Sequence, residues 1–312
     1  MKKHLFGWAA LGVCLAVVHT VAGAADPLPV FVSIAPQKFF VQQIGKELVT
    51  VHVMVAPGAS PHAYEPRPRQ MAELSKTKLY FAIGVTFEKA WLKRIAATNP
   101  GMQVVHTDHG IQKISMPAHH HQDDEPDQHD KTADHHHQDN HSHDHDHHNE
   151  QGLDPHIWLS PPLVKLQART ILDALKAADP DHRSDYEDNY HQFISEVDRL
   201  DHEMRAIFAG TAGLPFMVFH PAWGYFADAY GLKQVAIEME GKDPKPAQLQ
   251  ALIEQARAEG IRVIFVQPQF SSKSAELVAR EIDGQVAFAD PLAEDWAANL
   301  RGVAEKFRAA LK

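Results

Sequence analysis

The chain has 312 residues, of which 44% are hydrophobic and 22% are charged, and its formal net charge at pH 7 is −10 with histidine counted as neutral. This length is enough for two modest domains with cores of their own. The acidic balance argues against nucleic acid as a partner.

The N-terminal segment has the pattern of a secretory signal peptide. Two lysines precede an apolar run over 5–21, and the small residues 22–25 follow it. This order is typical of an export signal. We expect residues 1–24 to be removed, with cleavage after position 24 or 25, and the mature protein to be periplasmic. The run is short for a membrane span of ~20 residues, and no span is expected in the mature chain.

The only cysteine, Cys14, lies inside this signal, so we expect no disulfide and no thiolate metal site after processing. Loss of the two signal lysines changes the net charge from −10 to −12. Residues 117–152 hold ten acids and one lysine, which is −9 of that total. The rest of the mature chain is therefore close to neutral.

Residues 26–160 alternate between short apolar runs and amphipathic stretches. Alternation of strands and helices is typical of a parallel sheet with covering helices, so we predict an N-terminal α/β lobe here. The predicted strands are 30–34, 49–54, 79–83 and 103–105, and the predicted helices are 37–44, 68–76 and 87–96.

The segment 117–152 interrupts this lobe with a histidine-rich insertion. It has almost no aliphatic residues and cannot bury a core, so we expect a disordered loop. Histidines among carboxylates bind Zn²⁺, Cu²⁺ or Ni²⁺, and a floppy chain should offer weak, heterogeneous sites. The alternative is a solvated tract or a tag. The insertion contains twelve of the 23 histidines: His119, His120, His121, His129, His135, His136, His137, His141, His143, His145, His147 and His148.

Residues 161–209 are predicted to connect two lobes through helices. Apolar residues recur at spacings of three and four over 181–208, which indicates one helix roughly 42 Å long that stiffens the connection. Residues 210–312 repeat the α/β alternation and form the predicted C-terminal lobe. Its strands are expected at 215–219, 234–237, 261–266 and 286–289, and its helices at 223–230, 246–259, 272–282 and 296–311.

Four residues with metal-binding side chains stand near predicted strand ends: His62, His156, His220 and Asp290. In open α/β sheets ligands bind outside the carboxyl ends of the strands, so these side chains could converge on one cleft between the lobes. Each of the four, taken alone, has an alternative role as a capping or core residue.

The segments that carry these residues resemble the zinc-specific solute-binding proteins of bacterial ABC importers, the ZnuA-like group. The motifs are PHAYEP, DPHIWLSP, FHPAWGYFADAYGL, VQPQFSSKSAE and ADPLA, around a central histidine-rich insertion, and the resemblance extends from Val30 to the final helix. It implies two α/β lobes joined by a long rigid helix, with Zn²⁺ held between the lobes by His62, His156 and His220. It further implies a periplasmic receptor, not an enzyme, that delivers Zn²⁺ to the ABC permease of an inner-membrane importer. We expect a monomer.

The fourth ligand stays open at this point. Some zinc members of the family have a glutamate immediately before the first histidine, where this chain has Pro61. Asp290, Glu65 and water are the three candidates. The related manganese proteins have a carboxylate at the position of His220, and imidazole in its place favours zinc.

Several other polar residues are predicted to play structural roles. Glu238 and Glu240 are expected to cap a helix or to lie at the surface, and His52 to be a structural histidine in its strand. His106 and His109 are expected to lie in a loop away from the metal.

Two other functions use the same residue types. A zinc hydrolase also needs three ligands and a nearby carboxylate, but the chain has no His-Glu-x-x-His helix and no Ser or Cys nucleophile motif. A periplasmic zinc buffer or chaperone without an importer would require the same reversible binding as a transport receptor.

Overall fold

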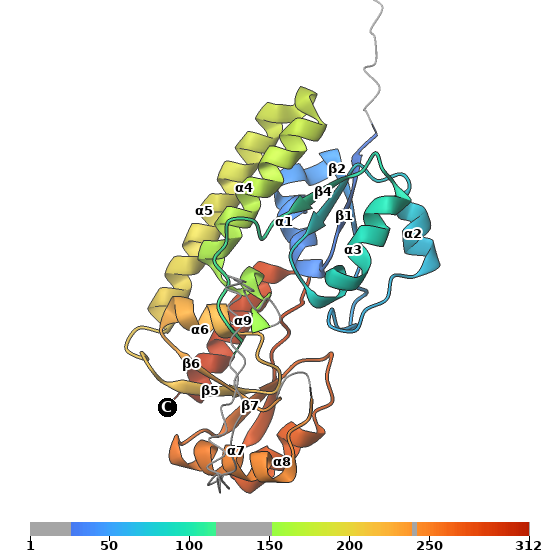
Figure 1. The fold of residues 1–312 in the computed structure, drawn as a ribbon. Coiled ribbons are helices and arrows are strands. Elements are labelled where there is room, and N and C mark those ends of the chain that lie inside the picture. The colour runs from blue at the N-terminus through green and yellow to red at the C-terminus, as the bar shows by residue number, and fades with distance from the viewer. Residues whose placement is uncertain (1–25, 117–151, 239–241, 312) are drawn as a thin grey trace, which may run out of the picture.

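The structure is a computed structural model that describes residues 26–116, 152–238 and 242–311. Two α/β lobes lie one beyond the other beside a pair of long helices (Figure 1). The predicted signal peptide, residues 1–24, lies outside the described residues, as do positions 117–151 of the predicted histidine-rich loop.

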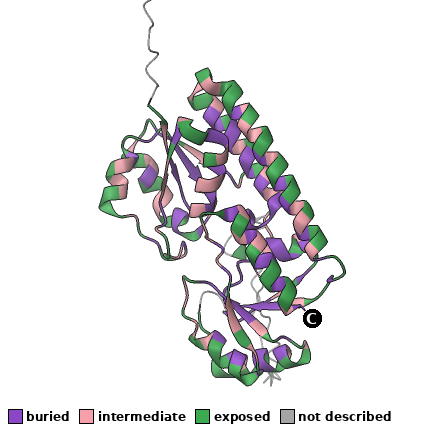
Figure 2. Cartoon of the chain, turned by 180° about the vertical axis from the view of Figure 1, so that it is seen from behind, coloured by how far each residue is buried: buried purple, intermediate pink, exposed green. Residues whose placement is uncertain are grey.

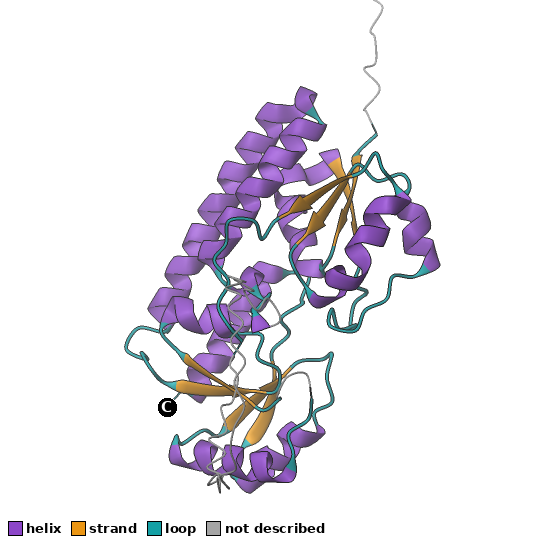
Figure 3. Ribbon diagram, in the orientation of Figure 1, coloured by secondary structure: helices purple, strands orange, loops and turns teal. Residues whose placement is uncertain are grey.

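The N-terminal lobe contains a parallel four-stranded sheet in the order β2-β1-β3-β4. Crossover helices join its strands, as the alternating sequence predicts, and Figure 3 shows the strands gathered beside their helices. The elements are β1 (Leu28–Val32), α1 (Ala35–Gly45), η1 (Lys46–Leu48), β2 (Val49–Val53), α2 (Pro68–Leu74), β3 (Leu79–Ala82), α3 (Thr86–Thr98) and β4 (Gln103–His106).

The C-terminal lobe repeats this topology with a second parallel sheet in the order β6-β5-β7-β8. The first strand in sequence is again internal, and the chain moves first to one side of it and then to the other. The elements are β5 (Pro215–Val218), α6 (Gly224–Tyr230), β6 (Lys233–Ala236), α7 (Pro246–Ala258), β7 (Val263–Val266), α8 (Lys273–Glu281), β8 (Gln285–Phe288) and α9 (Trp296–Ala310).

Two long helices connect the lobes. A 3₁₀ turn, η3 (Ile157–Leu159), leads into α4 (Pro161–Ala178), and α5 (Arg183–Ile207) follows. The predicted helix over 181–208 is present, but its first turn is a 3₁₀ turn, η4 (Pro180–His182). The 25 residues of α5 span roughly 37 Å, which is enough to reach along both lobes.

The largest hydrophobic core crosses from one lobe to the other. This shared core includes Val30 of β1, Phe193 of α5 and Trp296 of α9. The rings of Phe40 and Trp296 meet edge to face at 5.1 Å, which joins α1 of one lobe to α9 of the other. The buried residues, purple in Figure 2, accordingly continue through the junction between the lobes. This packing restricts movement of the lobes relative to each other.

A second, smaller core lies on the opposite face of the C-terminal sheet. Side chains of a strand alternate between faces, so Phe216 and Val218 of β5 face the shared core whereas Met217 faces the other way. We call this second cluster the outer core, and α7 and α8 cover it. Within the described residues, no helix is both long enough and apolar enough to cross a lipid bilayer.

Candidate metal centre

Three histidines from separate segments meet between the lobes. His62 lies in the loop after β2, His156 precedes η3, and His220 follows β5. One ring nitrogen from each lies within 4.8 Å of the others, and this is the one such group of three or more metal-binding side chains found among the described residues. The Nε2 atoms of His62 and His220 are 3.0 Å apart. The convergence predicted from the strand ends is therefore present for the three histidines.

The second nitrogen of each ring has a partner within the protein. The Nδ1 atom of His156 lies 2.7 Å from an Asp154 carboxylate oxygen, and Nδ1 of His220 lies 2.9 Å from a Glu238 carboxylate oxygen. Nδ1 of His62 lies 3.1 Å from the Thr86 hydroxyl. A ring that donates its Nδ1 proton presents the lone pair of Nε2. The two carboxylates thus orient His156 and His220 to offer Nε2 to an ion, and Nε2 of His62 points at Nε2 of His220.

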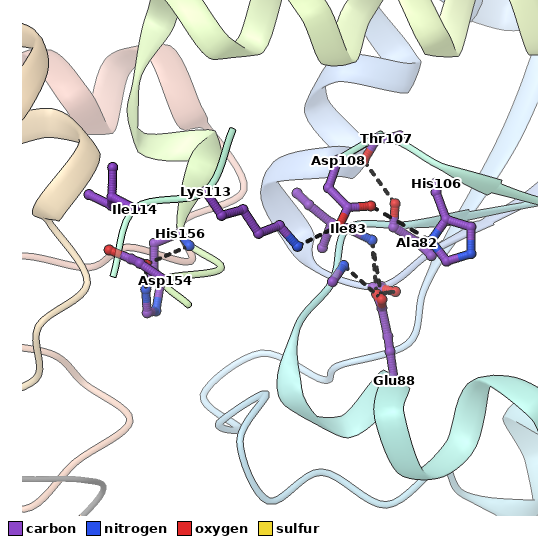
Figure 4. A network of polar contacts seen from close by, with 12 residues as sticks. Ala82, Ile83, Glu88, His106, Thr107, Asp108, Lys113, Ile114, Asp154 and His156 are labelled. Carbon is purple, nitrogen blue, oxygen red and sulfur yellow. Dashed lines mark hydrogen bonds and ion pairs between the residues drawn. The ribbon is translucent and has the colours of Figure 1, made fainter. Parts of the chain in front are cut away.

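The support of His156 is local in sequence. Asp154 is fully buried, and the same carboxylate oxygen that contacts the ring also accepts a 2.8 Å hydrogen bond from the backbone N–H of His156. Figure 4 shows this carboxylate turned toward the ring. Two hydrogen bonds to one oxygen fix both the main chain and the side chain of His156. The ring is only 4% exposed, so it has little freedom to reorient.

The support of His220 comes from elements farther along the chain. Glu238, which follows β6, is 6% exposed and reaches the imidazole because β6 pairs with β5. The Gln267 side-chain amide, at the end of β7, bonds both the backbone N–H and the carbonyl of His220, at 3.2 and 2.7 Å. Phe270 stacks on the imidazole with ring centroids 4.7 Å apart. His220 is therefore held on its backbone, its Nδ1 and its ring face.

His62 is half-buried and has a weaker support. Its hydroxyl partner Thr86 is exposed and stands at the first position of α3. The start of α3 is itself held by Glu88, whose carboxylate accepts backbone N–H groups of Ile83 and Gly84 at 3.0 and 2.8 Å (Figure 4). Burial raises the pKa of the Glu88 carboxyl, while the hydrogen bonds to it act in the opposite direction. Among the described residues, no ion pair includes the His62 ring.

The cluster disfavours protonated histidine. The pKa of His62 is lowered to about 3, mainly by burial and further by the proximity of His220 and His156. Burial also lowers the pKa of His220, against the opposing effect of Glu238. Both rings are therefore neutral near pH 7, which is the state that binds a metal ion.

The pocket around the imidazoles is otherwise mostly apolar. Trp158, Phe270, Pro291 and Leu292 line it together with the three histidines, Ser60, Pro61 and Gln269. Three nitrogen donors and no thiolate suit zinc, whose tetrahedral sites place N donors 2.0–2.1 Å from the metal and hence roughly 3.3 Å apart. The 3.0 Å separation of the two Nε2 atoms is close to that spacing.

Asp290 is not a member of the three-histidine group. One of its carboxylate oxygens accepts hydrogen bonds from the Gln269 side chain and from the backbone N–H of Leu292, both at 2.9 Å. These two partners line the pocket, so Asp290 stands immediately behind its wall. Glu65, the other protein candidate, is exposed. Neither carboxylate joins the cluster, and ligation by Asp290 stays a prediction.

Three of the residues expected to play structural roles can be compared with the structure. Glu238 was expected at the surface or at a helix cap, and this is wrong, because it is buried against His220. Glu240 lies outside the described residues. His52 stacks on Phe31 with centroids 5.2 Å apart, which agrees with a structural role. His106 was expected in a loop, and this is wrong, because it is the last residue of β4. It lies 3.6 Å from Asp108 (Figure 4) and takes no part in the cluster.

Sequence reasoning missed the carboxylates that orient the ligands. The role of Asp154 could have been predicted from its spacing, because an aspartate two residues before a ligand histidine can bond both the backbone and the ring of that histidine. The signal for Glu238 was weaker, since only the pairing of β5 with β6 brings it to His220. For Thr86, the only sequence feature that pointed to such a role was its place at the start of a predicted helix.

The whole described fold also matches known proteins. Residues 30–310 match the family described as zinc-uptake complex component A, periplasmic. The chain belongs to this family. It is 29% identical to the high-affinity zinc uptake system protein ZnuA of Bacillus subtilis (strain 168), over 82% of this chain and 76% of that protein.

Solved structures agree with this membership. A crystal structure of ZnuA superposes with a TM-score of 0.80 at 38% identity and covers 92% of this chain and 100% of that one. A ZnuA deletion mutant with zinc bound gives a TM-score of 0.79 at 39% identity, with 92% of this chain and 99% of that one covered. The family has the fold predicted from the sequence, with two α/β lobes beside a long helix.

Proposed function

We propose that this member of the family captures Zn²⁺ with His62, His156 and His220 and delivers it to an ABC-type importer. The observation that carries the proposal is the convergence of three imidazoles whose Nδ1 atoms all have partners and which each offer a ring nitrogen within 4.8 Å of the other two. Two ligands come from the N-terminal side of the molecule and one from the C-terminal lobe. The ion would therefore be bound at the junction, where it can be taken up and released without chemistry.

Zinc is favoured over the hard divalent cations by the donor set. Mg²⁺, Ca²⁺ and Mn²⁺ prefer oxygen ligands, whereas imidazole suits zinc, copper and nickel. The family membership and the zinc-bound relative support zinc among these ions. The rings of His62 and His220 are neutral near pH 7, so zinc would displace few protons from these two ligands.

Asp290 is proposed as the fourth ligand, with water as the competing occupant. It stands two residues after the end of β8, and a carboxylate would lower the formal charge of the site from +2 to +1. Asp290→Asn retains an oxygen that can accept from Gln269 and Leu292, so the turn should survive. Zinc affinity at least tenfold weaker, with unchanged apo stability, would support ligation. Unchanged affinity would assign the fourth position to water.

The twelve histidines of 117–152 are proposed to form an auxiliary set of weak zinc sites. Composition alone supports this, since these positions lie outside the described residues. Deletion of 117–151 should remove several weak zinc equivalents and leave one tight equivalent in calorimetry. Loss of the tight equivalent would instead place the main ligands in the insertion.

The location and partners of the protein are proposed from its N-terminal segment and its family. We propose export through a cleaved signal peptide at residues 1–24, action as a monomer in the periplasm, and docking to the permease of a zinc importer. N-terminal sequencing of the exported protein and sedimentation analysis test the first two points. Co-purification with a permease, compared with a chain that lacks the cleft histidines, tests the third.

Calorimetry on single-histidine variants tests the proposed function. His62→Ala, His156→Ala and His220→Ala should each weaken the tight zinc equivalent at least a hundredfold, because each removes one of three protein bonds. His106→Ala is the matched control, since this histidine is exposed and lies outside the cluster. Wild-type affinity in all three cluster variants would refute the site. Cells that carry a cluster variant should also fail to grow when starved of zinc.

A further inference from the structure

Tyr225 bonds two segments that meet at the base of the histidine-rich insertion. Its hydroxyl oxygen accepts the backbone N–H of Ile114 at 3.1 Å, and its O–H donates to the carbonyl of Asp154 at 2.8 Å. The two segments, 114–116 and 152–154, are also paired with each other through a bridge between Ser115 and Leu153. We call them the paired arms. One hydroxyl from the C-terminal lobe thus holds both arms.

The Tyr225 contact lies close to two of the proposed zinc ligands, His220 and His156. Tyr225 is in the first turn of α6, five residues after His220, and the residue is 3% exposed. Asp154, whose carbonyl it bonds, supplies the carboxylate that orients His156. The contact therefore joins the segment of one ligand to the segment of another across the lobe junction.

The residue before Tyr225 is Gly224, and its lack of a side chain allows the same contact to form. A Cβ atom at Gly224 would lie 2.7 Å from the second carboxylate oxygen of Asp154 and 3.3 Å from the side chain of Ile114. That oxygen of Asp154 is buried and has no hydrogen-bond partner among the described residues. The glycine lets the first turn of α6 approach Asp154 closely enough for the Tyr225 bonds to form.

The phenol keeps its proton under physiological conditions. Burial raises the pKa of Tyr225 to about 12, with a further contribution from Asp154. A neutral hydroxyl can donate to one carbonyl and accept from one N–H at the same time. Both bonds are thus available at any pH near neutrality.

We propose that Tyr225, with Gly224 beside it, is a positioning residue for zinc capture. It holds the Asp154–His156 pair against the segment that bears His220, so that the two buried imidazoles keep their separation before the ion arrives. A protein whose binding-competent arrangement is only partly populated has a correspondingly weaker apparent affinity. The inference rests on the proposed function, because it concerns the affinity of the same three-histidine site.

Tyr225→Phe tests the proposal, because it removes the hydroxyl and keeps the ring. The control is Tyr230→Phe in the same helix, which removes a buried phenol bonded to Asp201 at 3.1 Å, away from the site. We would measure the affinity of the tight equivalent by chelator competition, and the melting temperature with and without zinc. Tyr225→Phe should weaken zinc binding about tenfold and reduce the zinc-induced rise in melting temperature. Tyr230→Phe should preserve both.

The result that overturns the proposal is equal zinc affinity in Tyr225→Phe and Tyr230→Phe. Equal loss of melting temperature with and without zinc would also overturn it, since that is the behaviour of a purely structural bond. Gly224→Ala is an independent second variant if Tyr225→Phe folds poorly. It should push Asp154 away and weaken zinc binding, and wild-type affinity there would contradict the proposal.

These outcomes are distinct from failure of the proposed function. If the wild-type protein lacks a tight zinc equivalent, the function itself is wrong. If the wild type binds zinc tightly and the Gly224 and Tyr225 variants bind equally well, only the positioning role is wrong.

Discussion

The three ligand histidines are held in two different ways. His156 and His220 are buried, and each has a buried carboxylate on Nδ1 and a further bond to its backbone. His62 is half-buried, and its Nδ1 contacts an exposed hydroxyl on Thr86. We call the first two the fixed pair.

Because of this difference, we expect the three histidines to contribute unequally to zinc affinity. A carboxylate that accepts a hydrogen bond from Nδ1 of an imidazole makes its Nε2 a stronger metal ligand and fixes the orientation of the ring. An exposed hydroxyl strengthens and orients the imidazole less, because water can replace it as the hydrogen-bond partner. The fixed pair should therefore determine most of the affinity, while His62 closes the site and is the ligand most easily released.

The largest expected effect concerns the stability of the metal-free protein. His220→Ala leaves the Glu238 carboxylate buried without its partner, and we expect a loss of about 3 kcal/mol in the free energy of unfolding. His62→Ala leaves the Thr86 hydroxyl and Nε2 of His220 without a partner but strands no charged group, so it should cost less, about 1 kcal/mol. Urea unfolding of both apo variants measures the difference. Equal losses would remove the distinction between the fixed pair and His62.

A smaller effect is expected when the supports are changed and the ligands kept. Glu238→Gln should weaken zinc binding about 10- to 100-fold, the range typical of carboxylates behind metal-bound histidines. Valine has nearly the same shape as threonine but lacks the hydroxyl, so Thr86→Val should weaken zinc binding less than about fivefold. Chelator competition gives both affinities. A Thr86→Val effect as large as that of Glu238→Gln would contradict the account.

A further difference is expected in the pH dependence of the stability of the metal-free protein. The pKa of His62 falls from 6.5 to about 3 in the folded protein, chiefly through burial. Between these values the unfolded chain binds a proton that the folded chain does not, so folding stability decreases as pH falls from 6.5 toward 3. His62→Gln removes this group, and its stability should fall less steeply in urea titrations over that interval. Identical slopes would show that His62 titrates normally.

Much of the fold could be predicted because it depends on local patterns. Strand and helix bounds follow from short apolar runs and helical spacing, and a parallel sheet brings strand ends to one edge. The same rule anticipated His220, which follows β5, and His62, in the loop after β2, whereas His156 precedes η3 and stands at the end of no named strand. For His156 the family resemblance, and not the strand-end rule, supplied the prediction.

The remaining features depend on packing between elements, which no local pattern encodes. Glu238 reaches His220 only because β6 pairs with β5. The shared core depends on Trp296 packing against Phe40, two residues from opposite ends of the chain. Asp290 follows a strand as predicted, yet one of its oxygens is engaged with Gln269 and Leu292, a detail of turn geometry that its sequence position does not reveal.

The most direct test of the three-histidine site is anomalous diffraction at the zinc edge from crystals of the protein loaded with one equivalent of Zn²⁺. We expect the strongest peak about 2.0–2.1 Å from Nε2 of His62, His156 and His220, with their Nδ1 atoms still in contact with Thr86, Asp154 and Glu238, respectively. A strongest peak elsewhere, or coordination through Nδ1 of either member of the fixed pair, would contradict it.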